Sequence, residues 1–306
     1  MRKNAPRLEK KRTHGLETKK STIVAFVLPY FLVFFTFTIL PVIISIFISF
    51  TDFNAMQTPN FVFMDNYKRL FLQDDIFIKS IGNTFILALI TGPIGYILCL
   101  LFAWFINELR PVARAIVTLI FYAPSITGSM YLVWQAIFSG DAYGYLNGFL
   151  MNLGLASSPT VWLRDERYIL PIVAIVGLWS SLGTSFLTFI AGFQGVDRTY
   201  YEASALDGIK NRWQELWYIT LPIMRPQMIL SAVLSITSAF GVGAIVTQLA
   251  GFPSTNYAAH TIINHLQDFG SKRYELGIAS AIATILFIIM IVSNYAIRKI
   301  ISKVGS

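Results

Sequence analysis

Long apolar stretches without charge alternate with short polar segments along this chain. A helix needs about 20 apolar residues to cross the hydrocarbon core of a bilayer. Six stretches are long enough and contain no Asp, Glu, Lys or Arg: Ser21–Thr51, Ser80–Asn107, Ala115–Gly140, Tyr168–Val196, Pro226–Gln267 and Leu276–Ile297. The strands of a membrane β-barrel would instead alternate apolar and polar residues in segments of about ten. The pattern therefore predicts an all-α integral membrane protein with six transmembrane helices.

The fifth stretch is too long for one helix. Its Gly251-Phe252-Pro253 sequence is expected to end the span, leaving a polar external segment through Gln267. The six spans are expected at about residues 22–50, 81–106, 115–138, 169–193, 227–249 and 276–297. They form a single transmembrane domain (21–300) between a basic N-terminal tail (1–20) and a short C-terminal tail (301–306).

Composition and charge agree with a membrane protein. Of the 306 residues, 55% are hydrophobic and 13% are charged, and the mean hydropathy is +0.60. Eight of the 24 Lys and Arg residues precede the first span, and most of the others fall on the same side of the six-span topology. The positive-inside rule therefore places both termini in the cytoplasm. This bias also explains the net charge of +8 without a nucleic-acid partner. The first apolar run is too long for a signal peptide.

Sequence motifs for nucleotide binding and for catalysis are absent. The chain has no Gly-x-x-x-x-Gly-Lys-Ser/Thr loop, no His-Glu-x-x-His and no Gly-x-Ser-x-Gly. His260 and His265 are five residues apart, hence on different faces of a helix, and we interpret them as polar side chains of the external segment rather than metal ligands. The single cysteine, Cys99, permits no disulfide within the chain. No catalytic or metal site is predicted.

The spans contain hydroxyl groups but no acidic or basic side chain that could relay a coupling proton. The energy for any transport is therefore expected to come from outside the spans. Four hydroxyls in the fourth span follow helical spacing and share one face. Such groups either pack helices together, which is the more common role, or line a path for a polar, uncharged solute. The candidate path residues are Trp179, Ser181, Thr184, Ser185, Thr188 and Ser238.

A charged, amphipathic segment interrupts the apolar pattern between the fourth and fifth spans, on the predicted cytoplasmic side. Thr199-Tyr-Tyr-Glu202 has the form of a capping box. It predicts a short helix to about Asp207, with Gly208 as the residue that tolerates a left-handed stop. Asn211-Arg-Trp-Gln214 repeats the box and predicts a second short helix, closed by Pro222.

The second of these helices is expected to carry an apolar stripe with charges beside it. The stripe consists of Trp213, Leu216, Trp217 and Leu221. Such a helix–turn–helix could lie in the lipid interface, bind nucleic acid, or insert into a groove of a partner protein. Balanced acids and bases argue against nucleic acid. The residues by themselves leave lipid and partner open, with a partner favoured.

The sequence EASALDGIKNRWQELWYITLP (202–222) resembles the EAA motif of permease subunits of bacterial ABC importers. That motif consists of Glu-Ala-Ala, three residues, Gly, and then Ile-x-Leu-Pro. The matching residues are Glu202-Ala203-Ser204, Gly208 and Ile219-Thr220-Leu221-Pro222. Ser204 replaces the second alanine, and the spacing from Gly208 to Ile219 is one residue longer than the common form. We call residues 197–222 the EAA segment.

Four further segments extend the resemblance over nearly the whole chain. They are similar to the maltose-transporter-like, carbohydrate branch of these permeases. The segments are FVFMDNYKRLF (61–71), YGYLNGFLMNLGL (143–155), WSSLGTSFLTFIAGFQGV (179–196) and YELGIASAIATILF (274–287).

The resemblance implies a non-catalytic permease subunit in the bacterial cytoplasmic membrane. It would form a pore with a second permease subunit and work by alternating access. Two ATPase subunits, which would hold ATP and Mg, would drive it, and an extracytoplasmic solute-binding protein would deliver a sugar or oligosaccharide. The chain itself is expected to bind no cofactor. The EAA segment would dock into the ATPase through the residues that match the motif: Glu202, Ala203, Ser204, Asp207, Gly208, Ile219, Leu221 and Pro222.

The role of Glu202 has an alternative, and so does the function. Glu202 either pairs with a basic group of the ATPase or is only a helix cap. A secondary carrier working alone would take up solute without ATP. A membrane-embedded enzyme would need an acid–base pair or a metal cluster, which the sequence does not show. The sequence identifies neither the solute nor the partner subunits.

Overall fold

The computed structural model describes residues 20–127 and 130–301, and within these residues the chain forms helices and no β-strand. The predicted tails (1–20 and 301–306) lie outside the described residues, apart from Lys20 and Ile301. The chain divides into two compact units, the first ending at Phe47 and the second beginning at Ile48. The predicted all-helical class is confirmed for the described part of the chain.

The described residues of the first unit form one long apolar helix that ends at Ile48. It consists of α1 (Lys20–Phe34), a π-helical turn η1 (Phe35–Ile39) and α2 (Leu40–Ile48). Its 27 residues from Thr22 to Ile48 are long and apolar enough to cross a membrane. The helix therefore coincides closely with the predicted first span, 22–50.

Three further helices of membrane-spanning length lie in the second unit. The first runs from Asp75 to Asn107 and consists of α4 (Asp75–Leu89), η2 (Ile90–Ile94) and α5 (Gly95–Asn107). The second, Glu166–Gln194, consists of α9 (Glu166–Ser181) and α10 (Thr184–Gln194). The third is α17 (Leu276–Ile301). With the helix of the first unit, four described helices can cross a membrane by length and composition.

The predicted third and fifth spans are not continuous helices. The third corresponds to α6 (Pro111–Ile126) and α7 (Met130–Ile137), and the fifth to α14 (Arg225–Phe240) and α15 (Gly243–Ala250). The helix before α14 joins it at a bend of 81°, and counting this bent pair as one span raises the number to five. Gly251, with φ +76°, ends α15 as the sequence predicted. The count of six spans stays a prediction.

One hydrophobic cluster in the core of the second unit is built around α10, which packs between α5 and α14. Hydroxyl groups join α10 to α14: Ser185 Oγ donates to Ser231 O at 3.3 Å, and Ser231 Oγ donates to Ser185 O at 3.1 Å. Ser235 Oγ donates to Ser185 Oγ at 2.9 Å. Hydroxyls buried between helices are satisfied in this way where little water is present.

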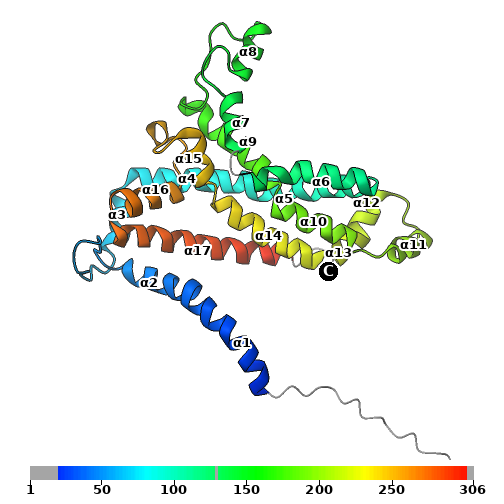
Figure 1. Ribbon diagram of the computed structural model, residues 1–306, viewed down its shortest axis with the longest axis horizontal. Helices are drawn as coiled ribbons and strands as arrows, with labels where there is room; N and C mark the ends of the chain where they lie inside the picture. Colours follow the sequence, from blue (N-terminus) through cyan, green and yellow to red (C-terminus); the bar gives the residue numbers. More distant parts are fainter. Residues whose placement is uncertain (1–19, 128–129, 302–306) are drawn as a thin grey trace, which may run out of the picture. The chain divides into compact units, whose positions relative to one another are not determined.

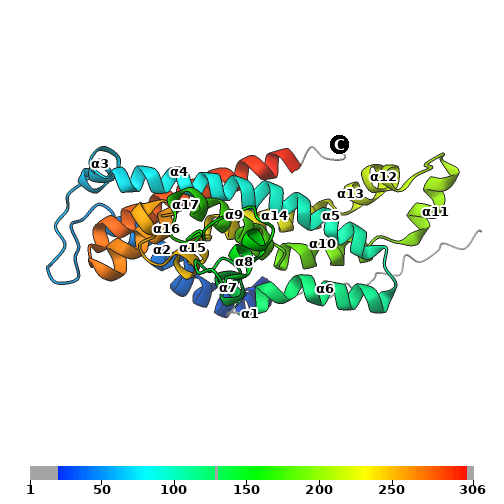
Figure 2. The same cartoon turned by 90° about the horizontal axis from the view of Figure 1, so that it is seen from above.

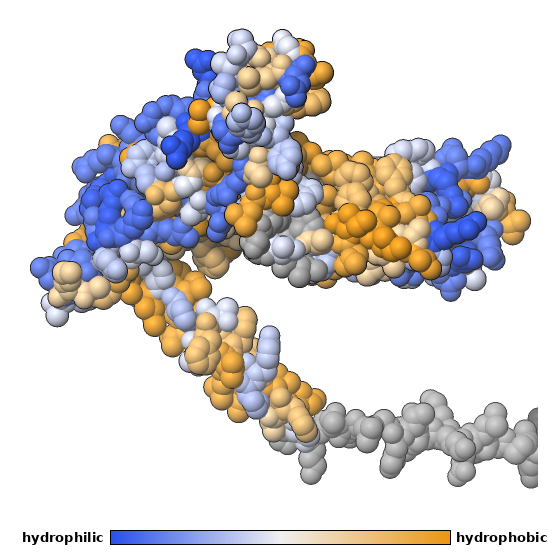
Figure 3. Space-filling model, turned by 45° about the horizontal axis from the view of Figure 1, so that its top comes forward, coloured by the Kyte–Doolittle hydropathy of each residue, from blue (hydrophilic) through white to orange (hydrophobic). Residues whose placement is uncertain are grey.

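The second unit is elongated, with short helices at its two ends. Figures 1 and 2 both place α3 (Asp65–Leu72) at one end and α11 (Arg198–Leu206) at the other, with α4, α5, α14 and α17 running lengthwise between them. On the face in Figure 3, apolar side chains fill the middle of this unit and hydrophilic side chains gather at its ends. This distribution is typical of a protein whose long axis crosses a bilayer. The other short elements are α8 (Tyr145–Asn152), α12 (Arg212–Glu215), η3 (Leu216–Thr220), α13 (Leu221–Ile223), η4 (Thr255–Tyr257), α16 (Ile262–Gln267) and η5 (Asp268–Lys272).

Candidate functional site

The EAA segment begins with a helix cap that the sequence analysis assigned wrongly. Helix α11 starts at Arg198, and its N-cap is Asp197, whose Oδ1 accepts a hydrogen bond from the amide of Thr199 at 3.0 Å. This bond holds the pKa of Asp197 below its ordinary value. The predicted capping box of Thr199 and Glu202 does not form, because the chain already enters the helix one residue before Thr199. Glu202 is therefore not a cap.

The turn after α11 forms as predicted around Gly208, which has φ +92°. The amide of Ile209 donates to Ser204 O at 3.1 Å, and the amide of Gly208 donates to Ala205 O at 3.4 Å. This pair of bonds is the Schellman motif, which satisfies carbonyls at a helix C-terminus and requires a left-handed residue. Inside the helix, Ser204 is buried and its Oγ donates to Tyr201 O at 2.8 Å.

The second helix starts as predicted but continues past its predicted end. Asn211 Oδ1 accepts from the amide of Gln214 at 2.8 Å, and Gln214 Oε1 accepts from the amide of Lys210 at 2.9 Å. The helix then passes through η3 and α13 to Ile223. Pro222 does not close it, because the π-helical turn shifts the bonding: the amide of Leu221 donates to Leu216 O, five residues back.

The predicted apolar stripe of the second helix is divided between the interior and the surface. Leu216 and Leu221 are each 4% exposed and pack into the core around α5 and α10. Trp213 and Trp217 are largely exposed. The tryptophans are thus displayed as expected for a surface stripe, whereas the two leucines are not, because helical spacing cannot tell which part of a wide apolar face meets the core.

The motif-matching residues also separate into two groups. Four are exposed at the surface, namely Glu202, Ala203, Asp207 and Gly208. Leu206, 91% exposed on the same helix, adds a large apolar side chain to this surface. Ser204 and Leu221 are instead buried, while Ile219 and Pro222 are partly buried. We call Glu202, Ala203, Leu206 and Asp207 the α11 face.

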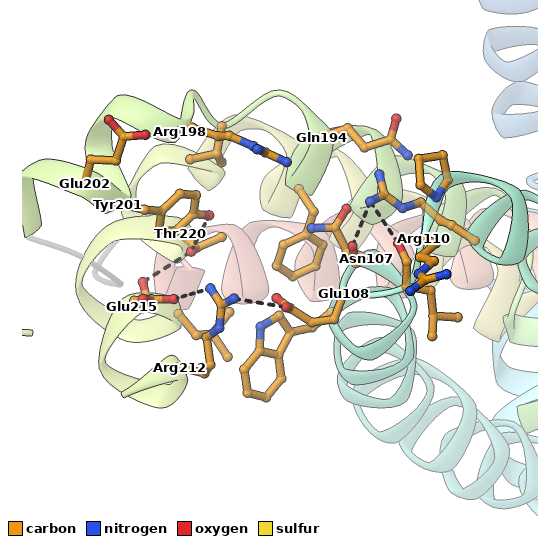
Figure 4. A pocket seen from close by; sticks show the side chains of 17 residues that line it. Asn107, Glu108, Arg110, Gln194, Arg198, Tyr201, Glu202, Arg212, Glu215 and Thr220 are labelled. Atoms are coloured by element: carbon orange, nitrogen blue, oxygen red, sulfur yellow. Dashed lines mark hydrogen bonds and ion pairs between the residues drawn. The ribbon is translucent and has the colours of Figure 1, made fainter. Parts of the chain in front are cut away.

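A cleft of about 820 Å³ lies beside the EAA segment, between the α5–α6 turn, the end of α10, and α11 and α12. Its lining includes Arg110, Arg114, Arg198, Glu202 and Arg212. Figure 4 shows Arg212 between Glu108 and Glu215. Sequence reasoning missed Glu108, although it is the first charged residue after a long uncharged span and lies close in sequence to Arg110.

The candidate path residues lie at a break in the fourth predicted span. Helix α9 ends at Ser181 and α10 begins at Thr184, so Ser181 does not share a continuous helix face with the other hydroxyls as predicted. Gly183 lies in the break, with φ −117° and ψ −126°, which are not helical values. Regular hydrogen bonding is lost there, and this changes the direction of the side chains on either side.

Several of these hydroxyls are already occupied. Ser181 Oγ donates to Leu178 O at 2.6 Å, Thr188 Oγ1 donates to Thr184 O at 2.9 Å, and Ser185 is bonded within the core. Thr184 and Ser238 are exposed. The ring of Trp179 packs edge-on against Trp134 at 5.4 Å between centroids. Of these three, Ser185 bonds across to α14, while Ser181 and Thr188 bond to carbonyls of their own helices.

Two histidines predicted to lie on separate helix faces are in contact instead. His260 precedes α16, and its Nε2 lies 3.4 Å from His265 Nδ1, while His265 Nε2 lies 3.1 Å from Asp74 Oδ2. Both rings are fully buried rather than displayed as surface polar groups. Within the described residues, no group of three or more His, Cys, Asp or Glu could hold a metal ion.

Acidification is expected to destabilise the protein through these histidines. Burial lowers the pKa of His260 to about 4 and lowers the pKa of His265 as well, against the opposing effect of Asp74. The unfolded chain, with histidine near pH 6.5, therefore binds more protons than the folded chain between about pH 6.5 and 4. His260 therefore lowers the stability as the pH falls through that window, by up to about 1.4 kcal/mol per pH unit, and the lowered pKa of His265 acts in the same direction.

The measurement is the thermal unfolding midpoint of the purified protein in detergent at pH 7.5 and at pH 5. His260→Gln should reduce the difference between the two values. An unchanged difference in this variant would show that other groups cause the acid sensitivity.

Comparisons with known proteins place the chain among transport permeases. The family model described as binding-protein-dependent transport system inner membrane component matches residues 93–304. The probable ABC transporter permease protein YesP of Bacillus subtilis is 28% identical over 286 residues, which cover 92% of this chain and 90% of that protein. The trehalose/maltose transport system permease protein MalF of Thermococcus litoralis is 29% identical, with 87% and 88% covered.

A solved structure has a similar fold. It is the crystal structure of a bacterial ABC transporter involved in the import of the acidic polysaccharide alginate. One of its chains is 25% identical, with a TM-score of 0.72 and coverage of 91% of this chain and 95% of that chain. A second structure of a bacterial alginate ABC transporter, in complex with an alginate pentasaccharide-bound periplasmic protein, gives a TM-score of 0.73 at 24% identity.

Proposed function

The chain belongs to the binding-protein-dependent transport system inner membrane components, and on this premise we propose that it carries a sugar or oligosaccharide into the cell. It is a permease subunit of an ABC importer and not an enzyme. The proposed solute class is supported by relatives named for arabinooligosaccharides, diacetylchitobiose and trehalose/maltose. The absence of acids and bases in the predicted spans suits an uncharged, hydroxyl-rich solute.

The α11 face is the observation that carries the proposed coupling to a separate ATPase. Among the described residues, the side chain of Glu202 makes neither an ion pair nor a hydrogen bond, and it is exposed beside Leu206. An exposed carboxylate next to a large exposed apolar side chain suits insertion into a partner's groove. The segment lies at one end of the second unit (Figure 1), where a partner outside the membrane could reach it.

Two ATPase subunits, holding ATP and Mg, are the proposed occupants of this end. Their closure would switch the pore between outward- and inward-facing states. A second permease subunit would complete the pore, and an extracytoplasmic binding protein would deliver the solute. The family's description and the neighbouring transporter's complex with a periplasmic protein support the delivery partner.

The proposed topology has six spans within residues 21–300, with both termini and the EAA segment in the cytoplasm. The bias of Lys and Arg toward that side supports it. The two hydrophilic ends of the second unit also suit a bilayer between them. This orientation can be tested by fusing two reporters in turn to the C-terminus, one active only in the cytoplasm and one active only outside. The cytoplasmic reporter is expected to be active.

The proposed solute path passes the break between α9 and α10. Interrupted helices inside a membrane are tolerated where they line a polar cavity or are buried in protein. Near this break, Ser180 Oγ and Trp134 Nε1 are buried and have no hydrogen-bond partner among the described residues. Such groups call for a partner, and a sugar hydroxyl would supply one beside the indole of Trp179. Thr184 and Ser238, which are exposed, are the remaining candidates for solute contact.

Reconstitution tests the function directly. The chain is purified with its copurifying subunits from native membranes and placed in proteoliposomes with the binding protein and radiolabelled sugars. Uptake that requires both ATP and the binding protein is expected. Uptake by the single chain without ATP would establish a secondary carrier and overturn the proposal.

Gly208→Ala is expected to reduce ATP-driven uptake about 5- to 30-fold. A side chain at φ +92° costs about 1–2 kcal/mol, and a Cβ there meets no other atom within 4 Å, so the effect arises from the backbone of the turn alone. Gly154→Ala is the matched control, because Gly154 has φ +71°, equally open space and the same bonding pattern after α8. Equal losses of uptake in the two variants would show that the turn at Gly208 has no particular role in coupling to the ATPase.

A further inference from the structure

We propose that Glu108 and Arg212 form a positioning link that carries movement of the EAA segment to the span α4–α5. The inference rests on the proposed docking of an ATPase on the EAA segment. Along the chain, the segment is joined to α10 and α14 but not to α5. The link therefore adds a polar side-chain contact between the segment and the end of α5, besides the apolar packing of Leu216 and Leu221.

Arg212 connects the end of α5 to the second helix of the EAA segment. Its Nη2 lies 3.3 Å from Glu108 Oε2, and its Nη1 lies 2.7 Å from Glu215 Oε2 (Figure 4). The planar guanidinium can hold two carboxylates at once in fixed directions, which a lysine ammonium cannot do. The hydrogen bond to Glu215 and the charge of Glu108 hold the pKa of Arg212 above its ordinary value.

The neighbouring tryptophan attaches the same helix to α5 a second time. The ring of Trp213 meets the buried ring of Trp104 edge-on, at 4.6 Å between centroids. Edge-to-face aromatic pairs have a preferred geometry and therefore resist rotation of one ring against the other. Arg212 and Trp213 thus fix the start of this helix on the last turn of α5.

A chain of hydrogen bonds connects the link to the α11 face. Tyr201 Oη lies 2.9 Å from Thr220 Oγ1, and Thr220 Oγ1 donates to Glu215 O at 3.2 Å. Tyr201 precedes Glu202 in α11, and Glu215 pairs with Arg212. Movement imposed on α11 can therefore reach Glu108 through the side chains of Tyr201 and Thr220, the backbone and side chain of Glu215, and Arg212.

The link is separable from folding because the ion pair between Arg212 and Glu108 is largely exposed. Their side chains are 63% and 45% exposed, and exposed ion pairs add little to stability. Reversing the charge of Glu108 should therefore leave assembly and the thermal midpoint unchanged. A role in transmission would instead change how much solute moves for each ATP hydrolysed.

The test compares E108R, R212E and the double variant E108R/R212E in the complete transporter in proteoliposomes. Each single variant is expected to lower the ratio of solute uptake to ATP hydrolysis at least fivefold, with the ATPase still bound. The double variant should recover part of the lost ratio, because the pair between positions 108 and 212 re-forms with opposite charges while the pair with Glu215 is lost. D65R is the matched control, since Asp65 forms an exposed ion pair with Lys68 at 3.1 Å at the other end of the unit.

An unchanged ratio in E108R, or no recovery in the double variant, overturns the link. Release of the ATPase in E108R also overturns it, because Glu108 would then serve docking rather than transmission. Failure of the proposed function is distinct: the unmodified chain would not copurify with an ATPase, or it would transport without ATP.

Discussion

Glu202→Gln is expected to lower ATP-driven uptake roughly thirtyfold or more while the chain stays folded. The side chain of Glu202 is exposed and makes no ion pair or hydrogen bond with any described residue, so neutralising it costs the chain itself little. In the proposed complex the carboxylate would be buried against a basic group of the ATPase. Truncating one partner of a buried charged pair costs about 2–5 kcal/mol, and about 1.4 kcal/mol corresponds to a tenfold change in affinity.

The structure makes this variant more informative than the sequence alone did. Asp197, and not Glu202, supports the first turn of α11, so a change in Glu202→Gln cannot be attributed to a lost cap. The measurements are ATPase copurification, ATPase activity and uptake. Asp75→Asn is the matched control, because it neutralises an exposed carboxylate in the first turn of α4, away from the EAA segment. Normal coupling in Glu202→Gln, with the complex assembled, would refute a docking role for this carboxylate.

Gly277→Ala is expected to destabilise the second unit by about 3 kcal/mol or more. A Cβ at this position would lie 2.0 Å from Thr51 O and 3.3 Å from Asn66 Nδ2. The chain at Thr51 cannot withdraw freely, because Asn66 Nδ2 donates to Thr51 O at 2.8 Å and the amide of Gly277 donates to Phe53 O at 2.8 Å. Overpacking costs about 1–3 kcal/mol, and each buried hydrogen-bonding group left unsatisfied adds about 1–3 kcal/mol.

The thermal midpoint and the yield of folded protein in detergent measure this effect. Gly82→Ala is the control, because Gly82 is also helical but a Cβ there would meet no other atom within 4 Å. Alanine there should be neutral or stabilising by about 1 kcal/mol. A Gly277→Ala protein as stable as the unmodified chain would show that the 51–53 segment can move aside.

The helical class and the ends of several helices could be predicted from sequence. Runs without charged residues located the helix of the first unit, the span through α5 and helix α17. Moving a charged side chain into hydrocarbon is costly, so Asp, Glu, Lys and Arg are rare inside a span. Single residues marked three local features: Gly208 a turn, Asn211 a helix cap and Gly251 a helix end. Each acts through its own backbone or side chain on groups only a few residues away. The match of the EAA motif to residues 202–222 was likewise a local pattern.

The sequence predictions were wrong where two neighbouring residues could both cap a helix, and where the local hydrogen bonding of the folded chain differs from the usual pattern. Asp197 and Thr199 are both good cap residues, and the chain direction after α10 selected Asp197. Proline usually ends a helix, but a π-helical turn before Pro222 allows the helix to continue. The uncharged run at 169–193 gave no sign of the break at Leu182–Gly183, because its residues are apolar or small on either side.

The sequence by itself determined that this protein is helical and suited to a membrane, which family it belongs to, and which segment matches the EAA motif. Those conclusions depend on local charge, spacing and motif residues. Only the tertiary structure decided that the Glu202 side chain has no partner among the described residues and that Leu221 packs the EAA segment against the core. It also decided that Arg212 reaches Glu108. Glu108 and Arg212 are far apart along the chain, so their contact depends on how α5, α10 and α14 pack, and no local pattern records it.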